Sequence, residues 1–345
     1  MSKKRDEEQF DLFVPFVTDL PLRDQRETME RPFFSLAKRK RLKPIDYTSP
    51  DGSTFVKVLP HSDYGMATIW DADILIWAAS VITERKNRRE NDISRKLSFQ
   101  PYDLLRAIGR PTGGREYLRI REAMARLQST VVVTNIRAKG KRKERQFGWI
   151  EGWTDLIDDE TGQSRGMTIT VSEWFHEGVI MEGGVLAIDP KYFEITGGRE
   201  RWLYRVARKH AGGADSLGFA VTIKTLFEKS GAEGSYRRFK FEMEKVVERN
   251  GLPEFFLAWE VDAKTKEPRI RMTRRSALDL THPGYEIPRY RSKRKDRQAP
   301  PRAFEHAAPA ELPHSAPSAD HADDGEPFDD EPLDDEPRLE DSDDE

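Results

Sequence analysis

The sequence predicts an α+β protein in which one order of helices and strands occurs twice, between two ends that do not fold. Three observations predict this: apolar periodicity is dense in the middle of the chain, both ends are rich in proline and charge, and the element order of residues 72–153 recurs in residues 191–273. A chain of 345 residues is long enough for two domains. Charged residues make up 34%, while 7 Trp and 18 Phe supply apolar cores.

The first copy of this order follows a strand pattern at 55–59. Its first helix is apolar on most sides, so we expect a central core helix with Asp71 as its N-cap. Pro101 opens the second helix, at a position where a missing N–H is harmless. The predicted elements are a helix at 72–84, a strand at 96–100, helices at 102–108 and 115–128, and strands at 130–136 and 146–153.

The second copy repeats this order with different residues. After a short helix at 191–194, the predicted elements are a helix at 200–211, a strand at 219–222, helices at 223–229 and 236–250, and strands at 255–261 and 269–273. Helix, strand, helix, helix and a closing pair of strands is the order of a winged helix. The sequence therefore predicts two tandem winged-helix domains, at 51–183 and 184–275.

Residues 1–50 are predicted to form a disordered, basic N-terminal arm. Prolines at positions 15, 21, 32 and 44 interrupt any long helix, because proline lacks a backbone donor and disfavours helix just before it. Phe33 and Phe34 are expected to pack onto the body. They precede a cluster of basic residues at 38–43.

Residues 276–345 are predicted to be a basic linker, densest at 289–297, followed by a disordered acidic tail. Residues 303–345 hold 17 acidic residues and one basic residue, a net charge of −16, which leaves +13 on the rest of the chain. The tail has too few large apolar residues to order itself. A basic body with an acidic tail favours nucleic-acid binding, although a tail that only improves solubility remains an alternative.

The long helix at 115–128 separates apolar from basic side chains. At about 100° per residue, one stripe is apolar and is expected to face the core: Tyr117, Ile120, Met124 and Leu127. Three arginines gather on the other side: Arg115, Arg119 and Arg126. We interpret this side as a DNA-contacting face, with a solvated face as the alternative.

The long helix at 236–250 repeats this division. Its predicted DNA contacts are Arg237, Arg238, Lys245 and Arg249. Glu242 and Glu244 dilute this basic face, and Phe241 points away from the core stripe, where a domain or subunit interface is expected.

The hairpin turn at 137–145 is the most basic loop of the body. Its predicted DNA contacts, as a wing along the phosphate backbone, are Lys139, Lys141, Arg142 and Lys143.

Several classes of function lack their residues. The chain has no cysteine, which excludes disulfides, thiolate metal sites and thiol catalysis and is typical of the cytoplasm. The seven histidines show no metal-ligand spacing, and no phosphate-binding loop motif occurs. The longest apolar run, 74–83, is about half of what a bilayer needs. We therefore expect a cytoplasmic binding protein without membrane contact, metal or cofactor, and not an enzyme.

Four motifs stand out in the body: RPFFSL at 31–36, YGMATIWDAD at 64–73, GGREY at 113–117 and RERWLY at 199–204. Together they resemble the replication initiator protein A family of bacterial plasmids, over roughly residues 30–275. The resemblance implies a tandem winged-helix initiator that binds double-stranded DNA at the plasmid origin and directs the host replication initiator and helicase machinery to it. It also implies repression of its own promoter and a switch between monomer and homodimer, with the state on DNA left open.

Two other functions stay open. A winged-helix transcriptional regulator without a role in initiation would use the same basic faces. An RNA-binding or chromosome-associated basic protein is less favoured, because no stacking platform of aromatic residues is evident.

Overall fold

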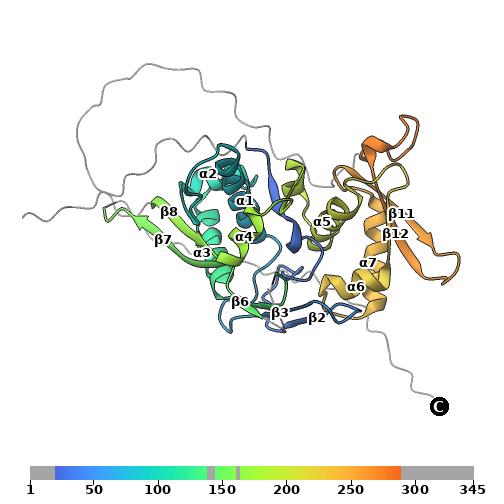
Figure 1. Cartoon of the computed structure of the whole chain (residues 1–345), viewed down its shortest axis with the longest axis horizontal. Coiled ribbons are helices and arrows are strands. Elements are labelled where there is room, and N and C mark those ends of the chain that lie inside the picture. The colour runs from blue at the N-terminus through green and yellow to red at the C-terminus, as the bar shows by residue number, and fades with distance from the viewer. Residues whose placement is uncertain (1–19, 138–143, 161–163, 289–345) are drawn as a thin grey trace, which may run out of the picture. The chain divides into compact units, whose positions relative to one another are not determined.

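The computed structural model describes residues 20–137, 144–160 and 164–288, which lie within one compact unit (Figure 1). This part of the chain is a mixed α+β structure with several small antiparallel sheets, as the sequence predicts. None of the helices in these residues is long and apolar enough to cross a membrane. The basic linker at 289–297 and the acidic tail lie outside the described residues.

The first copy of the repeated order has a three-stranded sheet at its centre. Its elements are α1 (Ala72–Asn87), β4 (Lys96–Phe99), α2 (Pro101–Ala107), α3 (Gly114–Ser129), β7 (Ile150–Ile157) and β8 (Ser164–Val171). The strand order is β4-β8-β7, with both pairs antiparallel. Helix α1 is buried from Ala72 to Thr83, as expected for a central core helix.

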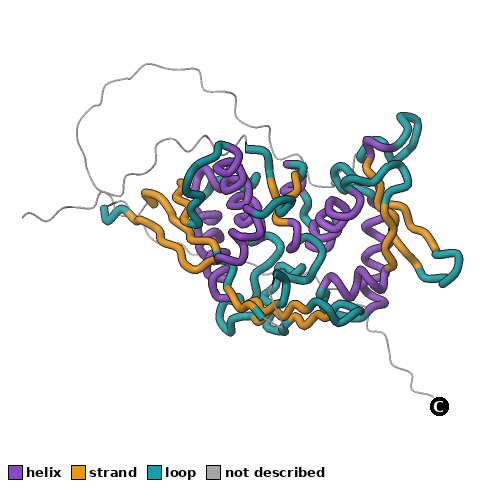
Figure 2. The backbone as a smooth tube through the Cα atoms, in the orientation of Figure 1, coloured by secondary structure: helices purple, strands orange, loops and turns teal. Residues whose placement is uncertain are grey.

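The second copy has the same arrangement of strands, and the same element order except that β5 (Val131–Thr134) and β6 (Arg145–Phe147) follow α3 in the first copy alone. Its elements are α5 (Gly198–Ala211), β10 (Phe219–Thr222), α6 (Ile223–Ser230), α7 (Tyr236–Arg249), β11 (Phe255–Val261) and β12 (Pro268–Arg274). The strand order is β10-β12-β11, again antiparallel. The order of helix, strand, helix, helix and closing hairpin therefore recurs, although the closing hairpin of the first copy is β7–β8 and not the predicted one. Figure 2 shows helices beside each hairpin.

The basic hairpin at 130–153 differs from its prediction. The predicted return strand breaks at Gly148 and Trp149, so that β6 (Arg145–Phe147) pairs with β5 (Val131–Thr134) while β7 pairs with β8. Trp149 is fully buried, and its backbone N–H donates to the carbonyl of Leu127 at 3.0 Å in place of a strand partner. The hairpin that closes the first three-stranded sheet is therefore β7–β8, and the expectation of one wing at 130–153 is wrong.

Strands β5 and β6 belong to a separate four-stranded sheet. It includes β2 (Ile45–Thr48) and β3 (Phe55–Leu59), in the order β2-β3-β5-β6. A further pair joins β1 (Arg23–Gln25) to β9 (Val185–Ala187). The remaining elements are short: η2 (Arg26–Thr28), α4 (Glu173–Ile180), η3 (Pro190–Glu194) and η4 (Arg275–Ala277).

Residues 20–50 form part of the body, so the expectation of a disordered arm is wrong for them. Phe33 and Phe34 are buried, and the ring of Phe34 stacks on Trp149 with 4.7 Å between centroids. Met29 is fully buried as well. The prolines exclude a long helix but leave an extended segment free to bury these side chains. Residues 1–19 lie outside the described part.

The prediction that Asp71 is the N-cap of α1 also fails. Asp71 has helical backbone angles and makes no side-chain cap to α1. Its carboxylate instead accepts a hydrogen bond from the Thr68 N–H at 2.8 Å and two from Arg126. The side chain of Asp71 is thus committed to a long-range contact.

Candidate nucleic-acid interface

Helix α3 buries the predicted apolar stripe and exposes the opposite side. Ile120, Met124 and Leu127 are fully buried, whereas Tyr117 is only half-buried. On the outer side lie Arg115, which is exposed and has no partner among the described residues, and Leu118, which is 57% exposed. The N-terminal end of α3, which follows the turn at Gly113, is therefore the part of the helix that a ligand can reach.

The other two predicted arginines of α3 are paired with carboxylates. Arg119 makes a surface ion pair with Glu116, one turn earlier in the helix. Arg126 binds the buried carboxylate of Asp71 through two hydrogen bonds of 2.8 Å. These bonds raise the pKa of Arg126 above its usual value. Arg126 thus joins α3 to the start of α1, and Arg115 and Arg119 remain the accessible cations.

Helix α7 begins with a true cap, because the hydroxyl of Ser235 accepts from the Arg238 N–H at 3.3 Å. Phe239, Met243 and Val246 form its buried stripe. Of its predicted DNA contacts, three pair with carboxylates: Arg238 with Glu242 at 3.1 Å, Lys245 with Glu248 at 2.9 Å and Arg249 with Glu200 at 2.6 Å.

Arg237, the fourth predicted contact of α7, is exposed and has no partner among the described residues. Phe241 lies away from the buried stripe, as predicted, and is 57% exposed. The Lys245 ammonium lies 5.4 Å from the centre of its ring. The outer side of α7 therefore presents an aromatic ring among cations.

The predicted wing residues Lys139, Lys141, Arg142 and Lys143 lie outside the described residues. The two ends of their hairpin are held by ion pairs: Arg137 with Glu27 at 2.6 Å, and Arg145 with Glu177. The guanidinium of Arg137 also lies 4.1 Å from the ring centre of Trp174. Ion pairs thus fix the residues just after β5 and at the start of β6.

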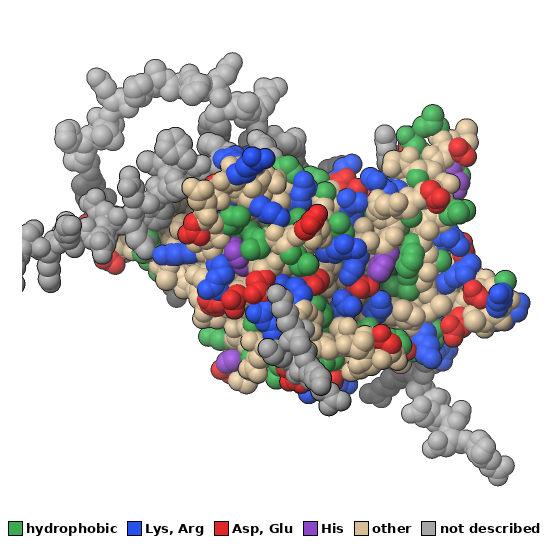
Figure 3. Space-filling view, viewed as in Figure 1, with side chains coloured by type: hydrophobic (Ala, Val, Ile, Leu, Met, Phe, Trp, Pro, Cys, Tyr) green, Lys and Arg blue, Asp and Glu red, His purple; other side chains and the backbone are tan. Residues whose placement is uncertain are grey.

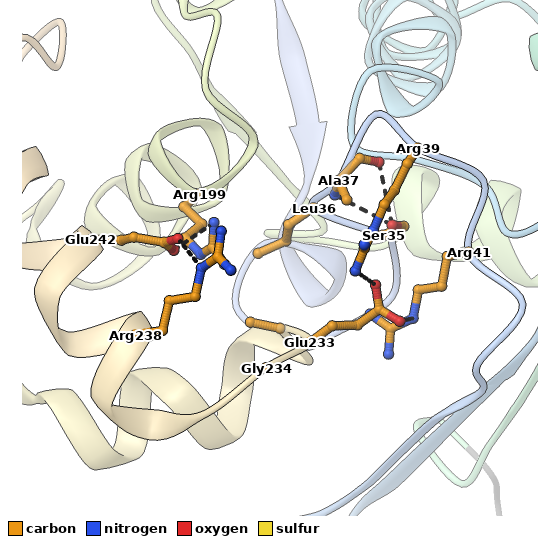
Figure 4. Close-up of a pocket in the computed structure, with 11 residues that line it drawn as sticks. Ser35, Leu36, Ala37, Arg39, Arg41, Arg199, Glu233, Gly234, Arg238 and Glu242 are labelled. Atoms are coloured by element: carbon orange, nitrogen blue, oxygen red, sulfur yellow. Dashed lines mark hydrogen bonds and ion pairs between the residues drawn. The ribbon is translucent and has the colours of Figure 1, made fainter. Parts of the chain in front are cut away.

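Three exposed cations lie between the two long helices, in the stretch that we call the basic segment, Lys38–Lys40. All three line a groove of about 610 Å³ whose other wall includes Arg119 and Arg126 of α3. Arg39 also lines a cavity of about 340 Å³ that Arg238 of α7 borders (Figure 4). The basic segment thus adjoins both helices.

Carboxylates in these two hollows are paired with arginines. Figure 4 shows Glu233 near Arg39 and Arg41, and Glu242 near Arg199 and Arg238. Figure 3 shows the same mixture on a wider scale, with Lys and Arg side chains spread over the face in view and acidic ones among them. Six cationic and three anionic side chains line the larger groove, so its local charge is positive.

The site predicted from the sequence does not include the basic segment, although the sequence shows a cluster of basic residues there. The sequence placed these residues on a disordered arm, and nothing local indicates that they lie beside α3 and α7. In the described residues, no group of three or more His, Asp or Glu side chains is arranged to hold a metal ion.

Two sequence comparisons find similar proteins. The sequence pattern of the family "Replication initiator protein A" matches residues 23–257. A curated protein of Wigglesworthia glossinidia brevipalpis, named "Putative replication protein", is 32% identical over 236 residues, which cover 68% of this chain and 83% of that protein.

Two crystal structures of domains 2 and 3 of RctB resemble the fold. One has a TM-score of 0.49 at 12% identity and covers 71% of this chain and 96% of the RctB chain. The other has a TM-score of 0.44 at 13% identity, with coverages of 70% and 94%. Since the family pattern spans more than half of the sequence and a curated relative shares 32% identity with it, the chain belongs to the replication initiator protein A family.

Proposed function

We propose that this protein is a plasmid replication initiator that binds double-stranded DNA at the plasmid origin through two winged-helix domains. The observation that supports this most is the doubled arrangement of helix, strand, helix, helix and hairpin, with the strand orders β4-β8-β7 and β10-β12-β11. In such a unit the helix before the hairpin enters the major groove. These helices are α3 and α7, and each presents an unpaired arginine, Arg115 or Arg237, on its outer side.

We place the first domain at 51–183 and the second at 184–275, with residues 20–50 packed on them. The proposed DNA contacts are Arg115, Arg119 and Arg126 in α3, Lys139, Lys141, Arg142 and Lys143 in the basic hairpin, and Arg237, Arg238, Lys245 and Arg249 in α7. Among these, Arg126 is the contact that the geometry favours least, because Asp71 holds its guanidinium. Exposed arginines near a helix start suit base edges, and hairpin lysines suit phosphates.

The proposed role is binding and not catalysis. At the origin, the bound protein would direct the host replication initiator and helicase machinery to the adjacent duplex, and at its own promoter it would repress transcription. A homodimer is part of this proposal, with the exposed Phe241 as a candidate contact. The family membership supports the replication role, since the curated relative is named for replication.

Footprinting of the full-length protein on the DNA that flanks its gene tests the proposal. Protection of directly repeated sites beside an A·T-rich stretch, together with replication of a plasmid that lacks its own initiator, is the expected result. Protection of a single promoter palindrome, without support of replication, would instead identify a winged-helix transcriptional regulator.

A further inference from the structure

The basic segment is held at both of its ends. Before it, the Ser35 N–H donates to the Ala67 carbonyl and the Ser35 carbonyl accepts from the Ile69 N–H, both at 2.9 Å. After it, the Arg41 carbonyl accepts from the Met66 N–H at 3.1 Å. These bonds fix the path of the backbone on either side of Lys38–Lys40.

The Arg41 side chain adds a link to the second copy of the fold. It is buried at 6% exposure, and its guanidinium donates to the Gly231 carbonyl at 2.6 Å and to the Lys43 carbonyl at 2.9 Å. Gly231 ends α6, the helix before α7. A buried arginine satisfied by carbonyls therefore connects the end of the basic segment to the helix pair that contains α7.

Two glycines allow the neighbouring backbone to come close. A Cβ on Gly65 would lie 2.8 Å from the side chain of Lys40, and Gly65 has a φ of +76°, which disfavours other residues. A Cβ on Gly198, at the start of α5, would lie 2.0 Å from the Leu36 carbonyl oxygen. The chain thus packs tightly around a segment whose three side chains remain outside.

The charges of these side chains are only partly neutralised. Lys38 lies 5.3 Å from the ring centre of Trp70, and Lys40 makes no ion pair within the described residues. Arg39 pairs with Glu233 at 3.2 Å, but its side chain is 75% exposed, so the pair is weak in water. A fixed segment with three solvent-facing cations suits a polyanion.

We propose that the basic segment enters the minor groove between two successive major grooves occupied by α3 and α7, and that it favours A·T pairs there. This rests on the proposed function. Helices that read adjacent half-sites lie about one turn of duplex apart, with a minor groove between them. The basic segment lines hollows that are bordered by residues of both helices, which is the position required of cations that enter that groove. The minor groove of A·T tracts is narrow and strongly negative, which attracts inserted lysine and arginine.

The test uses the duplex that the full-length protein protects, with its central base pairs, between the two protected major grooves, made A·T, G·C or inosine·C. Guanine places an amino group in the minor groove that A·T pairs lack. Inosine has no such group, so inosine·C resembles A·T in the minor groove and G·C in the major groove.

The parent protein should bind the A·T and inosine·C duplexes within about twofold of each other and the G·C duplex about tenfold more weakly. The triple variant Lys38→Ala, Arg39→Ala, Lys40→Ala should bind all three duplexes alike. A matched control, Lys57→Ala, Arg88→Ala, Lys191→Ala, also removes three exposed cations but touches neither hollow, and should keep the tenfold preference.

Each outcome has one meaning. Absence of any protected duplex would overturn the proposed function itself. Protection with equal affinity for the A·T and G·C duplexes, or a preference that the triple variant retains, would overturn only the minor-groove proposal. Discrimination against inosine·C as strong as against G·C would place the readout in the major groove and overturn it as well.

Discussion

Helices α3 and α7 occupy corresponding places in the two copies of the fold, yet they use corresponding basic residues differently. Aligning the two helix sequences by their buried stripes matches Ile120 with Phe239 and Met124 with Met243. The same alignment matches Arg126 with Lys245. Two helices with one pattern therefore allow a direct comparison, residue by residue.

The comparison separates a structural cation from a surface cation. Arg126 binds a carboxylate, that of Asp71, which is only 2% exposed. Lys245 is exposed, pairs with a surface glutamate and lies against the ring of Phe241. A basic helix face is thus no guarantee of a basic binding surface, because one of its members can be used to hold the fold together.

The largest expected effect concerns the ends of the two helices. Arg115→Ala with Arg119→Ala should weaken binding to the protected duplex by about 1–3 kcal/mol for each arginine that reads a base edge. Arg237→Ala with Arg238→Ala should weaken binding to the same duplex by less, because Glu242 and Glu244 already reduce the positive charge at α7. Binding titrations on specific and random duplexes measure both. Equal decreases in affinity for the two double variants would show that these glutamates do not matter.

The second prediction concerns stability and compares Arg126 with Lys245, the two aligned cations. Arg126→Ala leaves the buried Asp71 carboxylate without its partner and should lower the free energy of unfolding by about 2–3 kcal/mol. Lys245→Ala removes an exposed pair and should change it by less than about 0.5 kcal/mol. Urea denaturation followed by circular dichroism provides the values. Similar small changes in both variants would contradict a structural role for Arg126.

The repeat was predictable from the sequence because helix and strand periodicity is a local property. The stripes at Ile120 and Phe239, and the break after Gly212, are visible in short windows. The contacts that define the candidate site are not local. The pair of Asp71 with Arg126 spans 55 residues, and the bond from Arg41 to Gly231 spans 190.

Two of the three wrong predictions, the arm and the single wing, have the same origin. The prolines and charges of residues 20–50 are typical of a disordered arm. The segment is ordered because Phe33 and Phe34 are buried against Trp149 and its neighbours, which are distant in the sequence. Likewise, the strand expected at 146–153 is continuous in propensity, and only the burial of Trp149 divides it between two sheets. Tertiary packing overrides local propensity at both places.

The third effect compares the basic β5–β6 hairpin, which belongs to the four-stranded sheet, with the β11–β12 hairpin of the second copy. Neutralising these four residues, Lys139, Lys141, Arg142 and Lys143, should reduce the salt dependence of binding. If they contact about three phosphates, the slope of log binding constant against log salt concentration should become shallower by about 2–3 units. The second hairpin turn has two lysines, Lys264 and Lys266, and neutralising them should change the slope by less than about 2 units. Titrations at several salt concentrations yield both slopes. A parental slope in the four-residue variant would show that the first hairpin is only solvated.

The smallest expected effect concerns the acidic tail, which lies outside the described residues. Its charge of −16 contrasts with +13 on the rest of the chain, and a tethered acidic chain competes with phosphate for basic surfaces at high effective concentration. Since this competition is electrostatic and screened by salt, removing residues 303–345 should raise affinity for random duplex more than for the protected duplex, most of all at low salt. Measuring both affinities at two salt concentrations decides the matter: an unchanged specific-to-random ratio would leave solubility as the role of the tail.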